Sequence, residues 1–358
     1  MDTVRFDFEL PAGLIAQQPA EPRDSSRLLV LDRRTGSCRH LRFRQLPGLL
    51  RETDLLVHNN TRVSEYQLRA RRNTGGRLSV TLLEALDPEC RTWRCLIRGS
   101  IPARGGSLSL IGSDGTEMSA VVQEIGDDGT RIINVSRVLD TAVLARHGTV
   151  PLPPYIKDFT GDRERYQTVY AREAGSVAAP TAGLHFTKNL LDAVAAATMG
   201  VCPVTLQVGR DTFAPVRAND LTRHTLSGEP VEVPAATAQA VNRCRNAGGR
   251  VLSVGTTTTR TLEWAARQGG ADSGSRELRP AAGLADTYIY PGFRFRAVDC
   301  ILTNFHLPRS TPLFMISAFI GEVHTDPDRG RTMLLETYAT AIREGYRFYS
   351  FGDAMLIV

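Results

Sequence analysis

The chain has 358 residues, of which 42% are hydrophobic and 23% are charged. That length fits two ordinary domains, and that composition is typical of a globular protein whose core needs no disulfide or metal to hold it. The formal net charge of +5 suits a partner that carries phosphates, although many enzymes of small molecules have similar values.

The sequence lacks the marks of export, membrane insertion and a metal site. No apolar run is long enough to cross a bilayer, and Asp2, Asp7 and Glu9 stand where a signal peptide would have its apolar core. The six cysteines form no C-x-x-C pair, which is typical of reduced thiols rather than of a zinc site. We therefore expect a cytoplasmic protein that holds no metal and contacts no membrane.

Residues 1–63 have the pattern of an α/β fold. The apolar run from Leu28 to Leu31 predicts a short strand, and the Arg-Thr-Gly sequence at 34–36 predicts the turn of a hairpin. The segment from Asp54 to His58 predicts a second strand, which ends at two asparagines that favour turns.

Residues 64–150 have a different character. Short stretches of alternating apolar and polar residues are separated by glycine-rich turns, a pattern that predicts a small antiparallel β-barrel inserted into the larger domain. Residues 1–63 and 151–358 would then form one discontinuous α/β domain. The expected barrel strands lie within residues 78–83, 92–97, 107–111, 118–125 and 131–135.

After the proline-rich segment 151–154, the α/β pattern returns. Glycines at 248 and 249 close a predicted helix at 235–247, and the apolar segment 250–255 then predicts a buried strand of a parallel sheet. Further predicted helices lie at 189–197, 259–267 and 331–344, and further strands at 204–208 and 348–351.

Several segments next to these predicted strands are rich in small and polar residues, as binding loops often are. In the segment 178–187, Thr181 can cap the following helix and Gly183 permits close backbone approach. His185 is either a general acid–base group or a histidine that only satisfies backbone groups.

The segment from Gly255 to Glu263 joins a strand to the start of a helix. Free amide groups and the helix dipole at such a point favour an anionic group such as a carboxylate. Arg260 and Glu263 share one face of the helix and form either part of a site or a surface ion pair. Neither a Walker A loop nor a G-x-G-x-x-G dinucleotide motif is present.

Three more segments carry directed polar or aromatic groups. The segment 302–311 contains Asn304, His306, Ser310 and Thr311, which can hydrogen-bond a polar ligand. The segment 204–213 ends a strand in glycine and polar residues, and it is at least as typical of an ordinary turn as of a binding loop. The aromatic residues of the segment 346–355 are more typical of a core, although they could stack on adenine.

Taken together, these segments resemble the S-adenosylmethionine:tRNA ribosyltransferase-isomerase family of queuosine biosynthesis. The resemblance covers nearly the whole chain and rests on long, ordered motifs. They include residues 10–19, 26–33, 54–63, 151–156, 166–170, 178–187, 255–263, 290–293, 303–308 and 346–357.

The resemblance implies a larger α/β, barrel-like domain with an inserted small antiparallel β-barrel. It also implies transfer of the ribosyl part of S-adenosylmethionine to the aminomethyl group of a 7-deazaguanine base in tRNA, with release of adenine and methionine and formation of epoxyqueuosine. The implied proton-transfer residues are His185, His306 and Glu229, with Asp353 a weaker candidate. The implied substrate-binding residues are Thr181, Gly183, Phe186, Gln207, Gly209, Thr212, Gly255, Thr256, Thr257, Arg260, Glu263, Tyr290, Asn304, Ser310 and Thr311.

The chain departs from the family pattern in three segments. Gln207 and Asp211 stand where the family usually has a histidine and a glycine, Ser227 stands for a second histidine, and residues 64–67 replace Ile-Pro-Ala-Arg. Glutamine and serine cannot replace histidine as an acid or base near neutral pH.

These departures leave three hypotheses open. The first is the family reaction on tRNA, with a basic cluster near the barrel (Arg62, Arg69, Arg71, Arg72 and Arg77) contacting phosphates. The second is a divergent enzyme that uses S-adenosylmethionine with a small-molecule acceptor or with none. The third is a binding protein for tRNA or S-adenosylmethionine without catalysis.

Overall fold

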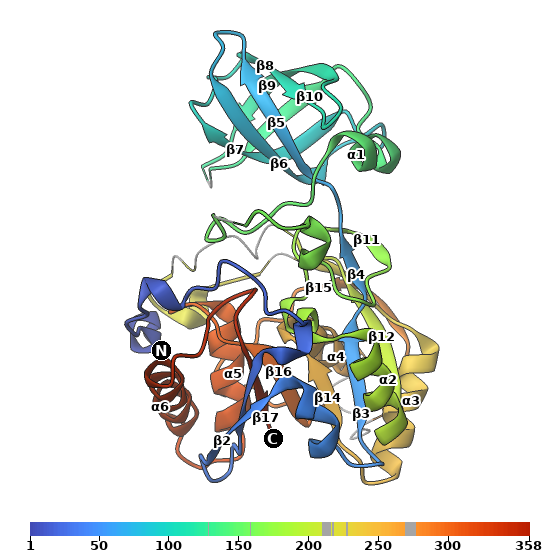
Figure 1. Cartoon of the computed structure of the whole chain (residues 1–358), viewed down its shortest axis with the longest axis vertical. Coiled ribbons are helices and arrows are strands. Elements are labelled where there is room, and N and C mark those ends of the chain that lie inside the picture. The colour runs from blue at the N-terminus through green and yellow to red at the C-terminus, as the bar shows by residue number, and fades with distance from the viewer. Residues whose placement is uncertain (128, 158, 210–215, 217, 227, 269–276) are drawn as a thin grey trace.

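The protein consists of a small barrel joined to a larger α/β domain, as the computed structural model shows in Figure 1. The structure describes residues 1–127, 129–157, 159–209, 216, 218–226, 228–268 and 277–358. Within this part of the chain, no helix is long and apolar enough to cross a membrane.

The larger domain is built on a nine-stranded mixed sheet with the order β15-β13-β12-β3-β14-β16-β17-β1-β2. Its central strands β12, β3, β14 and β16 are parallel neighbours, whereas β17 runs antiparallel to β16. The α/β class is therefore confirmed. Within the described residues, however, this sheet is open rather than barrel-like, and the closed barrel is formed by the inserted domain. The strands are β1 (Arg27–Leu31), β2 (Cys38–Arg42), β3 (Leu55–Asn59), β12 (Val201–Leu206), β13 (Glu229–Val233), β14 (Val251–Val254), β15 (Ala281–Ala285), β16 (Cys300–Asn304) and β17 (Ala354–Ile357).

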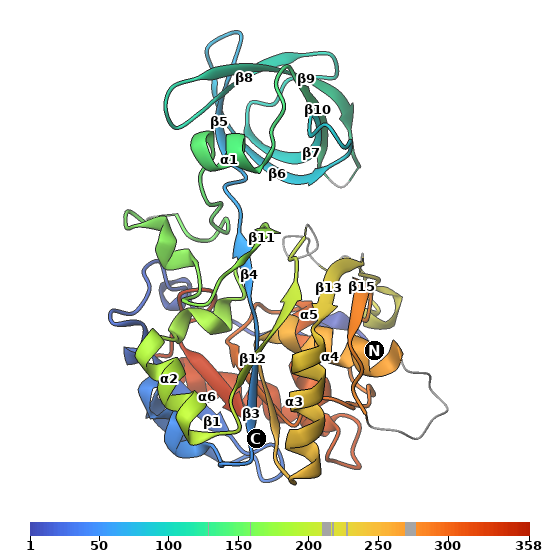
Figure 2. The same cartoon turned by 90° about the vertical axis from the view of Figure 1, so that its right-hand side faces the viewer.

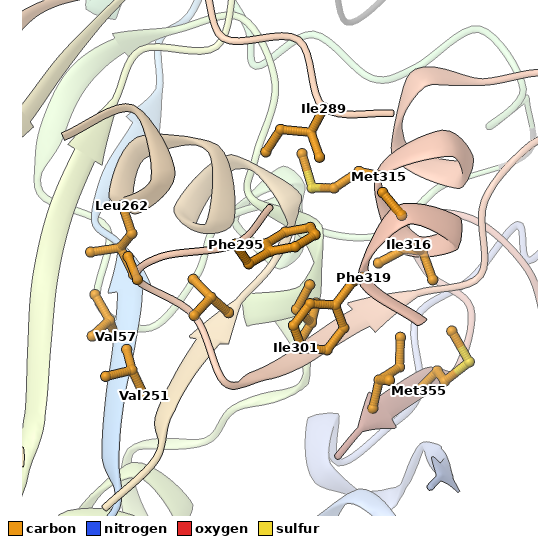
Figure 3. Packing of buried hydrophobic residues seen from close by; sticks show 14 of the residues in the cluster. Val57, Val251, Leu262, Ile289, Phe295, Ile301, Met315, Ile316, Phe319 and Met355 are labelled. Atoms are coloured by element: carbon orange, nitrogen blue, oxygen red, sulfur yellow. The ribbon is translucent and has the colours of Figure 1, made fainter. Parts of the chain in front are cut away.

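Alternate residues of the central strands point to opposite faces of the sheet and pack in two separate cores. Leu55 and Val57 of β3 pack in the larger core, which Figure 3 shows together with residues of α4 and α5. Leu56 lies in the other core, with Leu190 and Val194 of α2. The helices of this domain are α2 (Lys188–Ala197), α3 (Ala235–Asn246), α4 (Thr256–Gln268), α5 (Thr311–Gly321) and α6 (Arg329–Arg343).

The inserted domain is a closed antiparallel barrel with the strand order β10-β7-β6-β5-β8-β9 (Figure 2). Buried residues alternate with exposed ones along its strands, as in β9, because one side of each strand fills the barrel. The predicted barrel is confirmed, while the domain limits 64–150 stay a prediction. The elements are β5 (Gln67–Arg72), β6 (Arg77–Ala85), β7 (Thr92–Gly99), β8 (Ser107–Ile111), β9 (Glu117–Ile125), β10 (Arg131–Val135) and the short helix α1 (Thr141–His147).

The strand predicted at 348–351 is wrong. This segment is a turn before β17, and Tyr349 has a φ of 68° in the left-handed region, which a strand does not allow. The predicted helices at 189–197, 235–247, 259–267 and 331–344 correspond to α2, α3, α4 and α6. Helix α4 begins three residues earlier than expected, and the backbone N–H of Thr259 already donates to the carbonyl of Gly255 in its first turn.

One buried ion pair fixes the start of the two central strands β3 and β14. Asp54, only 1% exposed, accepts hydrogen bonds from the backbone N–H, Nε and Nη2 of Arg250 and from the N–H of Arg51. Burial alone would raise the pKa of Asp54, yet the hydrogen bonds from Arg250 and Arg51 outweigh it and hold the pKa below its ordinary value.

We expect Asp54→Asn to lower the free energy of unfolding at pH 7 by about 3 kcal/mol, because Arg250 loses its charge partner next to the core. The folded-state pKa of Asp54 lies below the unfolded one, so its contribution is present above about pH 4 and is lost as the pH falls further. Urea unfolding at pH 7 and pH 3 measures both effects. Glu117→Gln, which removes an exposed pair with Arg71, is the control, and a variant as stable as that control would contradict the argument.

Candidate active site

A cavity of about 560 Å³ lies at the carboxyl edge of the central strands. Residues that follow β14 and β16, such as Gly255 and Asn304, form its wall. In an open α/β sheet this edge is where ligands bind, because the loops that leave the strands converge there. In Figures 1 and 2 the same edge points toward the barrel, since β3 continues through β4 (Thr61–Val63) into β5.

Many of the residues predicted from the sequence meet on this cavity, although they come from distant segments. Others lie outside its wall, and Thr212 lies outside the described residues. The lining residues include Thr181, Glu229, Gly255, Thr256, Thr257, Arg260, Asn304, His306, Ser310 and Thr311, whereas Gly183, His185, Phe186, Gln207, Gly209, Glu263 and Tyr290 do not line it.

The start of α4 presents backbone N–H groups to the cavity. Gly255 has a φ of 88°, which glycine adopts without strain, and this turn aims the helix N-terminus at the wall. Thr256 and Thr257 lie in the first turn of the helix and line the cavity. The first N–H groups of a helix have no partner within it, so this wall suits an anionic group.

A buried ion pair lies beside the helix start. Glu229, at the beginning of β13, pairs with Arg260 of α4, and the two side chains are 6% and 11% exposed. The other carboxylate oxygen of Glu229 accepts a hydrogen bond of 2.6 Å from the N–H of Gly209. The pair offers both a positive and a negative group to a zwitterionic ligand.

Asn304 joins three segments of the wall through its amide. Its Nδ2 lies 3.2 Å from the carbonyl oxygen of Tyr349 and 3.2 Å from Nε2 of His185. Because a carbonyl can only accept, Nδ2 is the donor, and Nε2 of His185 must then be an unprotonated acceptor. Oδ1 of Asn304 accepts from the hydroxyl of Thr181 at 2.9 Å.

His185 therefore lies behind the cavity wall rather than on it. Its Nδ1 donates to Ser26 at 2.8 Å, and its ring stacks on Phe43 with centroids 4.9 Å apart. Burial lowers the pKa of His185 to about 4, so the ring is neutral near pH 7. His185 bonds to the side chains of Ser26 and Asn304 and so positions a neighbour on the wall, a role that neither of the two interpretations from the sequence described.

His306 is the histidine of the predicted set that lines the cavity. Its Nε2 lies 2.8 Å from the hydroxyl of Thr303, and its backbone N–H donates to the hydroxyl of Tyr338. Burial lowers the pKa of His306 to about 4, so it too is neutral near pH 7. A neutral imidazole on the wall can accept a proton or a hydrogen bond from a ligand.

Two tyrosines that are not among the predicted site residues form an aromatic wall. The rings of Tyr155 and Tyr349 lie 4.7 Å apart, and both line the cavity. Tyr349 keeps its left-handed φ because its N–H donates to Phe305 and its carbonyl accepts from Asn304. Strained backbone of this kind is concentrated at functional sites. For Tyr349, the sequence signal was its place in the aromatic segment 346–355.

The predicted residues that do not line the cavity have identifiable structural contacts. Gln207 donates through Nε2 to the carbonyl of Ala174 and accepts through Oε1 from Thr61, so it bonds to the paired strands β11 (Glu173–Ser176) and β4. The carboxylate of Glu263, fully buried in α4, accepts from three successive backbone N–H groups at 296–298 and from Arg267. Both side chains are engaged by the protein itself.

Gly183 and Phe186 pack against other residues of the protein and do not line the cavity. A Cβ atom at Gly183 would lie 1.9 Å from the hydroxyl of Tyr170, and Phe186 is fully buried against Phe43. Tyr290 packs behind Tyr288, which does line the cavity. The altered positions Asp211 and Ser227 lie outside the described residues.

Comparisons with known proteins decide the family. The model of the queuosine biosynthesis protein family matches residues 3–357. The S-adenosylmethionine:tRNA ribosyltransferase-isomerases of Geobacter sulfurreducens and Symbiobacterium thermophilum are 44% and 45% identical, over 100% and 99% of this chain and 100% and 98% of theirs. The chain belongs to the S-adenosylmethionine:tRNA ribosyltransferase-isomerase family.

A solved structure agrees with this assignment. The crystal structure of the S-adenosylmethionine tRNA ribosyltransferase from Thermotoga maritima is 34% identical and has a TM-score of 0.55, with 99% of this chain and 100% of that one covered. The resemblance found in the sequence is therefore confirmed for the family and for the fold.

We expect His185→Gln to make the stability of this family member less sensitive to mild acid. The pKa of His185 is about 4 when folded and about 6.5 when unfolded, so protonation favours unfolding as the pH falls through this range. Between pH 7 and pH 5 one such histidine lowers the free energy of unfolding by about 2 kcal/mol. The decrease should therefore be about 2 kcal/mol smaller in His185→Gln than in the wild type. Urea unfolding at both pH values measures it. His40→Gln, at an exposed position, is the matched control, and equal losses in both variants would rule out a neutral buried His185.

Proposed function

We infer that this chain transfers the ribosyl part of S-adenosylmethionine to the aminomethyl-deazaguanine base of tRNA and rearranges it, which gives epoxyqueuosine, adenine and methionine. The observation that carries this inference is the convergence of the family's motifs on one cavity of about 560 Å³, a size that fits a ligand such as S-adenosylmethionine. S-adenosylmethionine is thus the co-substrate and tRNA the partner, as the names of the full-length relatives imply.

The ion pair and the helix start are suited to the methionine end of the co-substrate. An amino acid carries a carboxylate and an ammonium group on the same carbon. The N–H groups of Thr256 and Thr257, together with Arg260, supply donors for the carboxylate, and Glu229 supplies an acceptor for the ammonium group. We place the methionine moiety at this end of the cavity.

The aromatic wall is suited to a nucleobase. Tyr155 and Tyr349 present apolar faces, and Tyr155 is fixed further by a hydrogen bond of 2.6 Å between its hydroxyl and Ser350. Flat heterocycles stack favourably on such rings. Asn304 and Thr181 lie on the same wall and provide polar groups that can orient the base.

His306 is the residue we propose for proton transfer. The reaction must remove a proton from the carbon beside the sulfonium, which needs a base close to that positive charge. An imidazole kept neutral by burial has a free electron pair near pH 7 and does not repel the sulfonium. Thr303 holds one ring nitrogen, which fixes the orientation of the ring.

The substitution of glutamine for the usual histidine at 207 does not favour a different acceptor. Gln207 lies outside the cavity wall, and its amide is used in hydrogen bonds to Thr61 and Ala174. A side chain in this position helps to hold the strands that contain Thr61 and Ala174, and we do not expect it to contact the reacting atoms. The reaction with a small-molecule acceptor, or with none, thus remains the alternative outcome of the first experiment below.

We expect adenine release from S-adenosylmethionine only when tRNA carrying the aminomethyl-deazaguanine base is added. Transfer of the ribosyl group needs the acceptor base in place, so we expect adenine release to depend on the binding of this tRNA. Chromatography of adenine after incubation with and without this tRNA measures the coupling. Release without tRNA would instead support the small-molecule or acceptor-free reaction, and tight binding of S-adenosylmethionine without any release would support a binding protein.

We expect His306→Asn to lower kcat by about 100- to 10,000-fold, because a positioned acid–base group contributes that much to proton transfer. Binding of S-adenosylmethionine, measured by calorimetry, should change little, since the proposed contacts of methionine lie on α4 and β13. His324→Asn removes a histidine that bonds to the carbonyl of Arg33 outside the cavity wall, and it should retain activity. Equal activity of the two variants would exclude His306 as the proton acceptor.

A further inference from the structure

A second pocket of about 340 Å³, lined by polar and apolar residues, lies where the barrel meets the larger domain. Arg69 enters it from β5 of the barrel, and Arg163 enters it from the short 3-10 helix Arg163–Tyr166 of the larger domain. His147, at the end of α1, completes the basic part of the wall. No residue of this pocket belongs to the cavity described above.

Among the residues that the structure describes, neither of these two arginines has an acidic partner, unlike the arginines near them. Arg62 pairs with Glu164 and Arg71 pairs with Glu117, so those charges are compensated. Arg69 donates only to the carbonyl of Gly112 within the described part of the chain.

Arg163 is likewise bound to neutral groups. It donates to the side-chain oxygen of Gln67 and to the carbonyl of Val150, and burial lowers its pKa below the ordinary value. Two guanidinium groups without a carboxylate thus line one pocket, with donors left over for an anion.

Asp114, which pairs with His147 of the pocket wall, does not cancel this charge. Asp114 accepts a hydrogen bond of 2.9 Å from His147, outside the residues that line the pocket. Hydrogen bonds from Thr116 and from His147 hold the pKa of Asp114 at about 2, so it is ionised and pairs with His147 rather than with either arginine.

Two chain segments connect this pocket directly to the cavity. Thr149 lines the pocket and Pro153 lines the cavity, so an extended chain separates them by at most about 14 Å. Arg163 and Tyr166, which line the pocket and the cavity respectively, are three residues apart on one 3-10 helix, or about 6 Å along its axis. A nucleotide whose base enters the cavity therefore brings neighbouring phosphates within reach of the pocket.

We propose that this junction pocket binds a backbone phosphate of the RNA next to the base that enters the cavity, with Arg69 and Arg163 as its ligands. The proposal rests on the proposed function, because S-adenosylmethionine in the cavity supplies no second anion. It gives the barrel a role, since one phosphate would contact both domains at once and set the register of the RNA strand.

The test is the salt dependence of tRNA binding by the full chain, measured by fluorescence anisotropy between 50 and 200 mM salt. Losing one phosphate contact should reduce the slope of log K against log salt by about 0.7 to 0.9. We expect this smaller slope for Arg69→Gln and for Arg163→Gln. Both variants should also bind tRNA more weakly at 50 mM salt and keep the wild-type affinity for S-adenosylmethionine. Arg71→Gln makes the same change of charge on the same strand and should keep the wild-type slope, because Glu117 already compensates Arg71.

Arg69→Lys separates charge from structure. It keeps the positive charge but loses the planar guanidinium that reaches Gly112, so it should retain most of the slope. A wild-type slope in Arg69→Gln, or a slope lost equally in Arg69→Lys and Arg69→Gln, would overturn the proposal. Failure of the proposed function is distinct: the wild type would then release no adenine while still binding RNA with a slope that depends on Arg69.

Discussion

The amide of Asn304 is the constraint on which the cavity depends. It comes from the last residue of β16, inside the sheet, and bonds to two other chain segments, the 3-10 helix Thr181–His185 and the turn at Tyr349. Each of its bonds has one possible direction once the carbonyl of Tyr349 has accepted from Nδ2. A buried polar network is stabilising only when every member is satisfied, so Thr181, His185 and Tyr349 are placed together or not at all.

The electrostatics of the cavity follow from burial. A sulfonium carries a permanent positive charge, and an imidazolium beside it would oppose binding in a site of low dielectric constant. Desolvation keeps both His185 and His306 neutral, so no such repulsion arises near pH 7. Glu229 and Arg260, a buried charge pair of the wall, compensate each other. The site can therefore bind a cation and a zwitterion without carrying a large net charge of its own.

The sequence was sufficient for the class of fold and for the loops of the site, but not for the role of each side chain. Alternation and glycine turns identified the barrel, because one side of each barrel strand must be apolar. The same pattern cannot say where a side chain points. His185 and His306 read alike in the sequence, yet one lies behind the wall and the other on it.

The missed elements share one physical cause. The strand expected at 348–351 was apolar enough, but its backbone turns through a left-handed residue, Tyr349, which hydrogen bonds with Phe305, Asn304 and Gly352 hold in place. Glu263 looked like the partner of Arg260 on one helical face, whereas the chain at 296–298 supplies its hydrogen bonds. In each case a tertiary contact from a distant segment overrides the local pattern, and a single sequence does not contain that information.

The junction between the domains shows how an inserted barrel can act on a distant cavity. The chain crosses between the domains twice, and the two crossings are joined by hydrogen bonds in both directions between the backbones of Gln67 and Thr149. They approach so closely that a Cβ atom at Gly148 would lie 1.8 Å from the carbonyl oxygen of Glu65. Arg163 then bonds to both crossings, through Gln67 and Val150. Neither crossing can shift against the other without breaking these hydrogen bonds, so the junction links the position of the barrel to that of the larger domain.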